Sequence, residues 1–350
     1  MKIAVGLSGG VDSAVAALLL KRAGHDVVGV TMKLWREGIF KGGSRDACFG
    51  PGEADDIAAA ESFCSRFGIV HRTFDCSEEY MRGVLDYFKS EREAGRTPNP
   101  CVVCNRRLKF GLLPEMAARS MEFDKFATGH YAQIVEIGGR LAVARAADVR
   151  KDQSYFLWGL SQTQLSRAMF PLGGIAKDEV RHLAREAGLP MAEKPDSQDF
   201  YSGDCNELVG AKDIPGSIVS TDGRVLGRHN GYWHYTIGQR QGLGIAAHEP
   251  LYVVRISKER NEVVVGTRAE AVSTEFSIGG MNWMAAAPES TKVDGLVKIR
   301  STGTPIGPAT LDGGTVHVPG GLFGVAPGQS AVLYSPEGAI LCGGVIESSA

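Results

Sequence analysis

The chain has 350 residues, of which 43% are hydrophobic and 22% charged, and its formal net charge is −2. This composition is typical of a folded globular protein of two or three domains, and it excludes a disordered chain and a uniformly basic nucleic-acid-binding chain. The densest apolar run near the start, residues 14–20, is too short to cross a membrane, and the N-terminus lacks the features of a signal peptide.

The first half of the chain alternates apolar, β-branched runs with helical patterns. The patterns predict strands over residues 2–7, 26–34, 71–74 and 123–128, and helices over 13–23, 53–67, 77–93, 110–119, 161–168 and 177–187. Residues 37–52 form a glycine-rich insertion, and residues 95–105 form a loop with two cysteines. This alternation predicts an α/β domain over residues 1–205, built on a parallel sheet covered by helices.

The sequence pattern changes after about Asn206, where short β-type runs alternate with Gly, Asp and Asn. The runs lie at residues 216–220, 223–227, 251–256 and 262–266, and the same pattern continues to the end of the chain. We therefore expect a small β-rich central domain over residues 206–272 and a C-terminal β-barrel or sandwich over residues 273–350.

The segment from Ser8 to Ser13, with the sequence SGGVDS, separates the first predicted strand from the first helix. Its glycines let backbone N–H groups face an anion, the helix N-terminus favours phosphate, and Ser8 and Ser13 supply hydroxyl donors. Asp12 suits a Mg²⁺ ion that bridges phosphates. The segment is neither a Walker A loop nor a G-x-G-x-x-G motif. It resembles the PP-loop of the ATP pyrophosphatases, which cleave ATP between its α and β phosphates and transfer AMP to a substrate oxygen.

Further motifs follow the loop in a fixed order. They read TPNPCVVCN at 97–105, ATGHYA at 127–132, KDQSYFL at 151–157, FPLG at 170–173, KPDSQ at 194–198 and YTIGQRQGLG at 235–244. Together with the loop they resemble the tRNA-specific 2-thiouridylases, the MnmA/TrmU family, over residues 4–266, with a weak match in the C-terminal domain. The resemblance implies that the wobble uridine of a tRNA is adenylated on its C2 oxygen and that sulfur then displaces AMP. It also implies a Rossmann-like PP-loop domain, a small central domain and a C-terminal β-barrel that contacts tRNA.

The resemblance also implies roles for individual residues. ATP is expected to contact the loop and two outlying positions: Gly6, Leu7, Ser8, Gly9, Gly10, Val11, Asp12, Ser13, Met32 and Gly129. The tRNA is expected to contact Asn99, Pro100, Cys101, His130, Lys151, Asp152, Gln153, Arg300, Ser301 and Gln329. Residues 89–109 carry six cations against two anions, which suits phosphate neutralisation but is equally typical of a solvated face.

Seven cysteines, an odd number, argue against a disulfide framework and favour a cytoplasmic protein. The family's first working cysteine corresponds to Cys104, but its second, in the pattern Asp-Ser-x-x-x-Cys, corresponds to Tyr201. In one mechanism, Cys205 replaces that second cysteine and carries a persulfide. Cys104 then forms a disulfide with Cys205, and the cations Arg106, Arg107 and Lys109 favour the thiolate.

In a second mechanism, Cys101, Cys104 and Cys205 hold a 4Fe–4S cluster whose open iron presents hydrosulfide to the base. Cysteine at position 101, where the family usually has Asp, favours this mechanism; zinc is less favoured, because structural zinc normally takes four ligands. The sulfur donor is then a persulfide carrier, a cysteine desulfurase or free sulfide. The remaining cysteines, at positions 48, 64, 76 and 342, are interpreted as structural or incidental.

Two other functions compete with tRNA thiolation. A PP-loop ligase or amidotransferase that acts on a small molecule would need neither the 97–105 segment nor a C-terminal barrel. A non-catalytic tRNA-binding or redox-sensing protein would have a degenerate loop, and the intact Ser8, Asp12 and Ser13 argue against such decay. The sequence therefore favours an ATP-dependent tRNA thiolase with tRNA as its partner and no membrane association.

Overall fold

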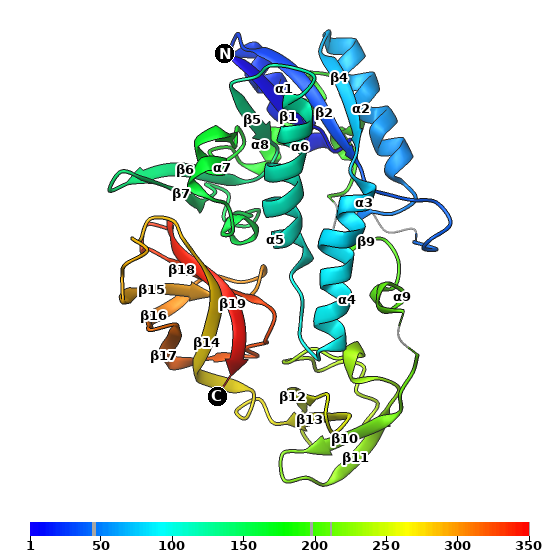
Figure 1. Ribbon diagram of the computed structural model, residues 1–350, viewed down its shortest axis with the longest axis vertical. Coiled ribbons are helices and arrows are strands. Elements are labelled where there is room, and N and C mark those ends of the chain that lie inside the picture. Colours follow the sequence, from blue (N-terminus) through cyan, green and yellow to red (C-terminus); the bar gives the residue numbers. More distant parts are fainter. Residues whose placement is uncertain (44–46, 197–198, 211, 350) are drawn as a thin grey trace. The chain divides into compact units, whose positions relative to one another are not determined.

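The computed structural model describes residues 1–43, 47–196, 199–210 and 212–349 (Figure 1). The chain divides into two compact units: Met1–Leu85, Pro100–Glu207 and Gly338–Ile340 form the first, and Asp86–Asn99, Leu208–Glu337 and Leu341–Ala350 form the second. The sequence predicts three consecutive domains, whereas each of these units is assembled from separate stretches of the chain. Among the helices of the described ranges, none has both the length and the apolarity that a membrane span requires.

A five-stranded parallel sheet forms the core of the first unit, in the order β4-β2-β1-β5-β8. Its strands are β1 (Lys2–Gly6), β2 (Asp26–Lys33), β4 (Val70–Asp75), β5 (Lys125–Thr128) and β8 (Ala168–Met169). The central strand β1 is apolar and β-branched, and its residues Ile3, Ala4 and Val5 are fully buried, as expected where helices cover both faces of a parallel sheet. The predicted strands are confirmed to within about two residues at each end; β8, with two residues, is too short for a sequence pattern.

The helices α1 (Val11–Arg22), α2 (Glu53–Phe67) and α8 (Lys177–Glu186) contribute apolar residues to the core around this sheet. The helix predicted over residues 77–93 is confirmed as the consecutive turns α3 (Ser77–Tyr80), η1 (Met81–Leu85) and α4 (Asp86–Glu93). Of these turns, α4 belongs to the second unit. The shorter helices of the first unit are η3 (Ser154–Leu157), α7 (Gln162–Arg167) and η4 (Pro190–Glu193), and α9 (Cys205–Val209) begins in the first unit and ends in the second.

The loop predicted over residues 95–105 is partly wrong. The helix α5 (Pro100–Cys104) begins within it and continues into η2 (Asn105–Leu112) and α6 (Leu113–Ala118). Pro100 occupies the first helical position, where its missing N–H costs nothing and its fixed φ suits the helix. The two cysteines of this segment therefore lie on a helix.

Two small strand pairs complete the first unit. The hairpin of β6 (Ala132–Ile137) and β7 (Arg140–Arg145) is antiparallel, and β3 (Ala47–Phe49) pairs in parallel with β9 (Asp199–Tyr201). Residues near the end of the chain join the hairpin: Ala144 forms a bridge with Ala339, and the Arg145 N–H donates to the Gly338 carbonyl at 2.9 Å. This contact explains why Gly338–Ile340 belongs to the first unit.

The second unit contains a four-stranded sheet and a closed six-stranded barrel. The sheet has the order β11-β10-β13-β12, with β10 (Gly216–Ser220), β11 (Val225–His229), β12 (Tyr252–Ser257) and β13 (Glu262–Gly266), and the short helix η5 (Tyr232–His234) follows β11. The barrel has the order β14-β17-β16-β15-β18-β19, with β14 (Val272–Trp283), β15 (Lys292–Lys298), β16 (Ile306–Asp312), β17 (Thr315–Phe323), β18 (Ser330–Tyr334) and β19 (Ile340–Ser349). The predicted fold class is thereby confirmed.

The strand order of the parallel sheet reverses between β1 and β5, because β2 and β4 follow on one side of β1, and β5 and β8 on the other. At such a switch point the carboxyl ends of adjacent parallel strands open a crevice that commonly binds a ligand. Gly6, the last residue of β1, is in register with Thr128, the last residue of β5. The SGGVDS loop and the Gly129-His130 segment therefore meet at one edge of the sheet.

Candidate active site

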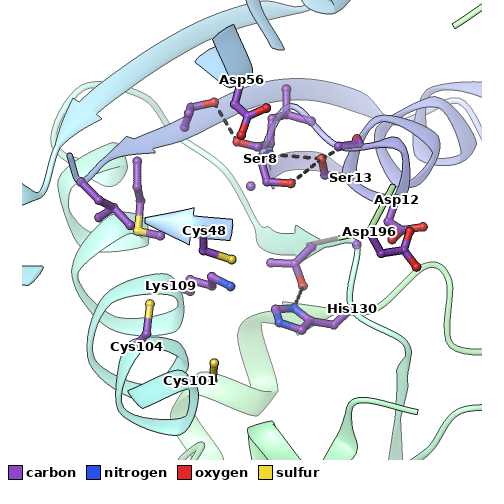
Figure 2. A pocket seen from close by; sticks show the side chains of 18 of the residues that line it. Ser8, Asp12, Ser13, Cys48, Asp56, Cys101, Cys104, Lys109, His130 and Asp196 are labelled. Atoms are coloured by element: carbon purple, nitrogen blue, oxygen red, sulfur yellow. Dashed lines mark hydrogen bonds between the residues drawn. The ribbon is translucent and has the colours of Figure 1, made fainter. Parts of the chain in front are cut away.

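A cavity of about 330 Å³ opens at this edge of the first unit (Figure 2). Fifteen of the predicted site residues line it: Gly6, Leu7, Ser8, Gly10, Val11, Asp12, Ser13, Met32, Pro100, Cys101, Cys104, Gly129, His130, Lys151 and Gln153. Gly9, Asp152 and Cys205 belong to the same unit, and they are not among the lining residues. The structure thus joins the predicted phosphate loop and two of the three predicted working cysteines in one chamber.

The loop from Ser8 to Ser13 is closed by its own hydrogen bonds. The Ser8 N–H donates to the Ser13 Oγ at 3.1 Å, the two hydroxyls lie 3.3 Å apart, and the Ser13 hydroxyl donates to the Gly10 carbonyl at 3.2 Å. The first N–H groups of α1 have no partner within the helix, and they start directly from this loop. The arrangement is a preformed anion site at a helix N-terminus.

At two positions near the loop, neighbouring backbone atoms lie so close that only glycine fits. Gly9 has φ of +72°, and a Cβ built on it would lie 2.4 Å from the Asp56 carbonyl oxygen. A Cβ on Gly129 would lie 2.7 Å from the carbonyl carbon of Asp12 and 2.7 Å from the nitrogen of Ser13. Gly9 therefore supports the loop from outside the cavity, and Gly129 packs directly on the start of α1.

Asp12 belongs to a partly buried ion-pair network that the sequence did not predict. Its carboxylate accepts hydrogen bonds from the Lys177 ammonium at 2.7 and 2.8 Å and from the Tyr131 hydroxyl at 2.7 Å. Lys177 also pairs with Asp196 at 2.7 Å, and Lys151 pairs with Asp196 at 2.8 Å. Burial raises the pKa of Asp196, but these two lysines hold it below its ordinary value.

Lys177 is one of the site residues that the sequence analysis missed. It is buried at the first position of α8, although a helix N-terminus disfavours a cation, and this conflict is the signal that could have identified it. Because the Asp12 carboxylate already binds Lys177 and Tyr131, its predicted role as a Mg²⁺ ligand stays a prediction. Asp196 begins a motif whose next two residues, Ser197 and Gln198, lie outside the described residues.

The predicted tRNA-contacting triplet at residues 151–153 divides into different roles. The Gln153 side chain accepts a hydrogen bond from the Tyr131 N–H at 2.9 Å. The Asp152 side chain is 1% exposed, and it accepts from the N–H and the hydroxyl of Ser154 at 3.1 and 3.0 Å. Asp152 therefore fixes the local turn, whereas Lys151 and Gln153 line the cavity.

His130 lies on the wall of the cavity, and its Nδ1 is 2.8 Å from the Thr128 hydroxyl. Its ring lies near two phenylalanine rings, with centroids 5.8 Å from Phe110 and 6.1 Å from Phe170. Burial, and then the neighbouring Lys109 cation, lower the pKa of His130 well below its ordinary value. The imidazole is therefore neutral at neutral pH, and it suits stacking or a hydrogen bond rather than pairing with a phosphate.

The cysteines of the cavity come from two elements. Cys101 and Cys104 lie one turn apart on α5, so their side chains share one face of the helix. Cys48, on β3, also lines the cavity, although the sequence interpretation set it aside as structural or incidental. All seven cysteines are described, and none is in a disulfide; Cys64, Cys76 and Cys342 are buried.

The predicted cluster site requires Cys101, Cys104 and Cys205 to lie at one place. Cys205 begins α9 and does not line the cavity. Within the ranges that the structure describes, no three His, Cys, Asp or Glu side chains are grouped so that they could hold a metal ion. In the described residues, Cys101, Cys104 and Cys205 therefore form no three-thiolate ligand set, and a cluster at these positions stays a prediction.

The electrostatic environment of Cys104 differs from the sequence expectation. Burial raises the pKa of the Cys104 thiol to about 11, although the Lys109 cation lowers it. Arg106 and Arg107, which were expected to favour the thiolate together with Lys109, are exposed, and neither contributes to this shift. The expectation is therefore confirmed for Lys109 alone, and burial outweighs its effect.

This environment predicts how Cys104 reacts with iodoacetamide. The rate of its alkylation should rise about tenfold for each pH unit from pH 7 to 9, without a plateau, because the thiolate fraction of a thiol with a pKa near 11 grows over that whole range. The substitution Lys109→Gln should slow the reaction at every pH in this range, since it removes the cation that lowers the pKa. Peptide mass spectrometry after timed alkylation follows Cys104 alone.

The matched control is Arg107→Gln, which removes an exposed cation from the same helical segment and should leave the alkylation rate unchanged. A rate that levels off near pH 8 would contradict the assigned environment of Cys104. Equal rates for the wild type and Lys109→Gln would exclude Lys109 as its electrostatic partner.

The second unit joins two of the predicted tRNA-contacting segments. The Gln329 side-chain amide donates to the carbonyls of Thr97 and Pro98 at 3.3 and 3.0 Å, and the Asn99 amide donates to the Ser330 hydroxyl at 3.4 Å. The segment that leads into the cysteine helix is therefore fastened to the start of β18.

Arg300 and Ser301 lie on the loop after β15. The Arg300 guanidinium donates to the Gly324 carbonyl at 2.9 Å and lies 5.7 Å from the centre of the Phe323 ring, while Ser301 is exposed. Arg300 thus has a structural contact, and Ser301 is available at the surface. Neither residue has a contact that tests its predicted role.

Comparison with known proteins gives matches over nearly the whole chain. Family profiles match residues 1–201 (tRNA methyl transferase HUP domain), 206–267 (tRNA methyl transferase PRC-barrel domain) and 273–346 (Aminomethyltransferase beta-barrel domain). A protein of Endomicrobium trichonymphae named tRNA-specific 2-thiouridylase MnmA is 44% identical over 99% of both chains, and one of the same name from Gloeothece citriformis is 42% identical over 99% of both.

Similarity to solved structures is more distant. A crystal structure of a 4-thiouridine synthetase–RNA complex with bound ATP is 16% identical, with a TM-score of 0.36, over 59% of this chain and 45% of that chain.

Proposed function

Because the chain belongs to the family of tRNA-specific 2-thiouridylases, we propose that it replaces the C2 oxygen of the wobble uridine of tRNA by sulfur, in a reaction driven by ATP. One observation carries this assignment to the site: the phosphate loop Ser8–Ser13 and the cysteines Cys101 and Cys104 line the same cavity. Activation by ATP requires the phosphate loop beside the target base, and delivery of sulfur requires a cysteine beside the same base. This cavity brings the loop and the cysteines together.

The activation step follows from the loop. The phosphates of ATP bind the N-terminus of α1 and the hydroxyls of Ser8 and Ser13, where N–H dipoles stabilise the charge that develops during phosphoryl transfer. The C2 oxygen of uridine attacks the α-phosphorus, and pyrophosphate leaves. Met32, at the end of β2, lies on the cavity wall and suits an apolar contact with the adenine. Mg²⁺ is the expected partner of the phosphates, as in other reactions of this class.

Recognition of the tRNA uses residues of both units. In the first unit, Pro100, Cys101, His130, Lys151 and Gln153 line the cavity and are proposed to contact the target base and its neighbours. In the second unit, Asn99, Arg300, Ser301 and Gln329 are proposed to contact the tRNA. A cytoplasmic location is expected, since the substrate is tRNA.

Sulfur delivery is proposed to use a persulfide rather than an iron–sulfur cluster. The described residues form no three-ligand set, whereas Cys104 lies in the cavity beside a cation that favours its thiolate. The donor is then a persulfide carrier or a cysteine desulfurase. Iron-dependent activity would instead support the alternative mechanism, in which a cluster binds hydrosulfide that is supplied as free sulfide.

The family profiles are described in terms of methyl transfer, and the cavity favours sulfur transfer over that chemistry. A methyl group from a sulfonium donor reaches a base without prior activation by ATP, so a PP-loop would have no use. Displacement of a C2 oxygen by sulfur does need that activation, because hydroxide is a poor leaving group and AMP is a good one.

The test measures pyrophosphate release and modified bases with unmodified tRNA, ATP and a persulfide donor. We expect tRNA-dependent pyrophosphate release and one AMP for each 2-thiouridine. Asp12→Ala should abolish both and spare tRNA binding, since Asp12 anchors the start of α1 through Lys177; Asp178→Ala, at an exposed carboxylate of α8, is the control. Pyrophosphate exchange without tRNA would support a small-molecule ligase instead, and a methylated base would support methyl transfer.

A further inference from the structure

The pairing of β3 with β9 determines which side chains face the cavity. Ala47 is in register with Asp199, and Phe49 with Tyr201, so Cys48 lies opposite Phe200. Successive side chains of a strand point to opposite faces, and Cys48 and Phe200 both line the cavity. Phe49 and Tyr201 are fully buried, on the other face of the pair.

Tyr201, which stands where the family has its second cysteine, is fixed away from the cavity. Its hydroxyl accepts a hydrogen bond from the Gly42 N–H at 3.1 Å and donates to the Glu207 carboxylate. Its ring packs against Phe49 and Phe40, with centroids 5.9 and 6.2 Å away. In this register, a sulfur at position 201 would not face the loop; the strand beside it does present one, at Cys48.

A single lysine connects Cys48 with the two cysteines of α5. In Figure 2 the Lys109 side chain lies between Cys48 and the pair of Cys104 and Cys101, and all four residues line the cavity. Burial lowers the pKa of Lys109, but the three sulfurs together raise it above its ordinary value. Within the described part of the chain, Lys109 has neither a hydrogen bond nor an ion pair, so its ammonium is available to stabilise a thiolate or a persulfide anion.

Cys48 and Cys104 differ in solvent exposure, which suits them to different steps of sulfur transfer. Cys48 is exposed, so a donor can reach it, whereas Cys104, on α5, is only partly exposed. Cys205, the alternative from sequence, is at the start of α9 and outside the cavity.

We propose that Cys48 is the cysteine that carries the persulfide sulfur, and that Cys104 forms a disulfide with Cys48 when the thiolated base is released. This assignment rests on the proposed function, because it supplies the second half of that reaction. It gives Cys48 the task that the sequence assigned to Cys205.

The steps balance as follows. A persulfide donor transfers its outer sulfur to the Cys48 thiol, and the terminal sulfur of that persulfide attacks C2 of the adenylated uridine; the C2–O bond breaks and AMP leaves with the electron pair. The Cys104 thiolate then attacks Sγ of Cys48. The Sγ–S bond breaks, and its electron pair stays on the sulfur bound to C2, which gives 2-thiouridine as N3 regains a proton. Cys48 and Cys104 are oxidised to a disulfide, and an external dithiol reduces it for the next cycle.

The first experiment needs neither ATP nor tRNA. The full chain is incubated with a cysteine desulfurase and ³⁵S-cysteine, and the labelled peptide is identified by non-reducing mass spectrometry. We expect the label on Cys48 in the wild type and in Cys205→Ser, and its loss in Cys48→Ser. A label on Cys205 that survives Cys48→Ser would overturn the assignment.

The second experiment is a single turnover with ATP and unmodified tRNA in the absence of reductant. One Cys48–Cys104 disulfide should form for each 2-thiouridine, and Cys48→Ser should lower the yield by roughly 100-fold or more while pyrophosphate release continues. A Cys104–Cys205 disulfide, or turnover that depends on iron and forms no disulfide, would refute the role of Cys48 and leave the proposed function intact. Absence of tRNA-dependent pyrophosphate release from the wild type would instead refute the proposed function.

Discussion

Replacement of Cys104 by serine is expected to lower 2-thiouridine formation at least about 1,000-fold while tRNA-dependent release of pyrophosphate continues. The reason is that two sets of residues line the cavity: the loop Ser8–Ser13 is proposed to bind the phosphates, and Cys104, on α5, is proposed to act on sulfur only after AMP has been transferred. Serine is close to cysteine in size, and its hydroxyl can form neither a persulfide nor a disulfide. The loss is therefore chemical, and the helix should remain folded.

Two measurements separate this outcome from its alternatives. Pyrophosphate release in a single turnover reports activation, and mass spectrometry of the digested tRNA reports sulfur. Val103→Ser, which changes the neighbouring position on the same helix and does not line the cavity, should retain both activities. Loss of pyrophosphate release in Cys104→Ser would mean that Cys104 helps to bind the activated base, and retention of thiolation would remove it from the reaction.

Replacement of Gly129 by alanine is expected to impair the activation step, in which ATP adenylates the base and pyrophosphate is released. The new methyl group would lie 2.7 Å from backbone atoms of Asp12 and Ser13, so the start of α1 or the Thr128–His130 segment has to shift. Displacement of a phosphate site by about 1 Å can lower a rate by roughly 100-fold, and overpacking of this kind costs about 1–3 kcal/mol of stability. Pyrophosphate release should therefore fall by about 100-fold, and thiolation should fall with it.

The control for this change is Gly174→Ala. Gly174 is exposed, with nothing within 4 Å of the position of its added Cβ, so both the rate and the midpoint of thermal unfolding should stay at the wild-type values. Measurement of pyrophosphate release against ATP concentration distinguishes a shifted binding site from global unfolding. Wild-type release by Gly129→Ala would show that the contact between β5 and α1 does not position the loop for catalysis.

Much of the first unit follows from local sequence. The central strands β1 and β2 are apolar, β-branched runs, and the loop Ser8–Ser13 forms an anion site from its own residues and the adjacent helix. The meeting of this loop with Gly129 also follows, since carboxyl ends of adjacent parallel strands share an edge. Local sequence patterns were therefore sufficient to predict the phosphate loop, because its anion site depends on the backbone conformation of adjacent residues.

The site residues that were not predicted from the sequence depend on contacts between segments that are distant in the chain. Cys48 enters the cavity because β3 pairs with β9, two strands of three residues that carry no periodic signal. Lys177 becomes part of the site because α8 packs beside α1, which brings its ammonium to Asp12. The cysteine helix was predicted as a loop because Pro100 and its neighbours are typical of turns, although proline also suits a first helical position.

The late return of the chain to its first unit has a consequence for biosynthesis. The β6–β7 hairpin gains the Ala144–Ala339 bridge and the Arg145–Gly338 hydrogen bond only after the ribosome has translated Gly338 and Ala339. The first unit, although it includes residue 1, is thus completed after most of the barrel has been translated. A nascent chain truncated before Gly338 lacks this last piece, so a complete catalytic unit is produced only together with the part of the protein proposed to hold its tRNA.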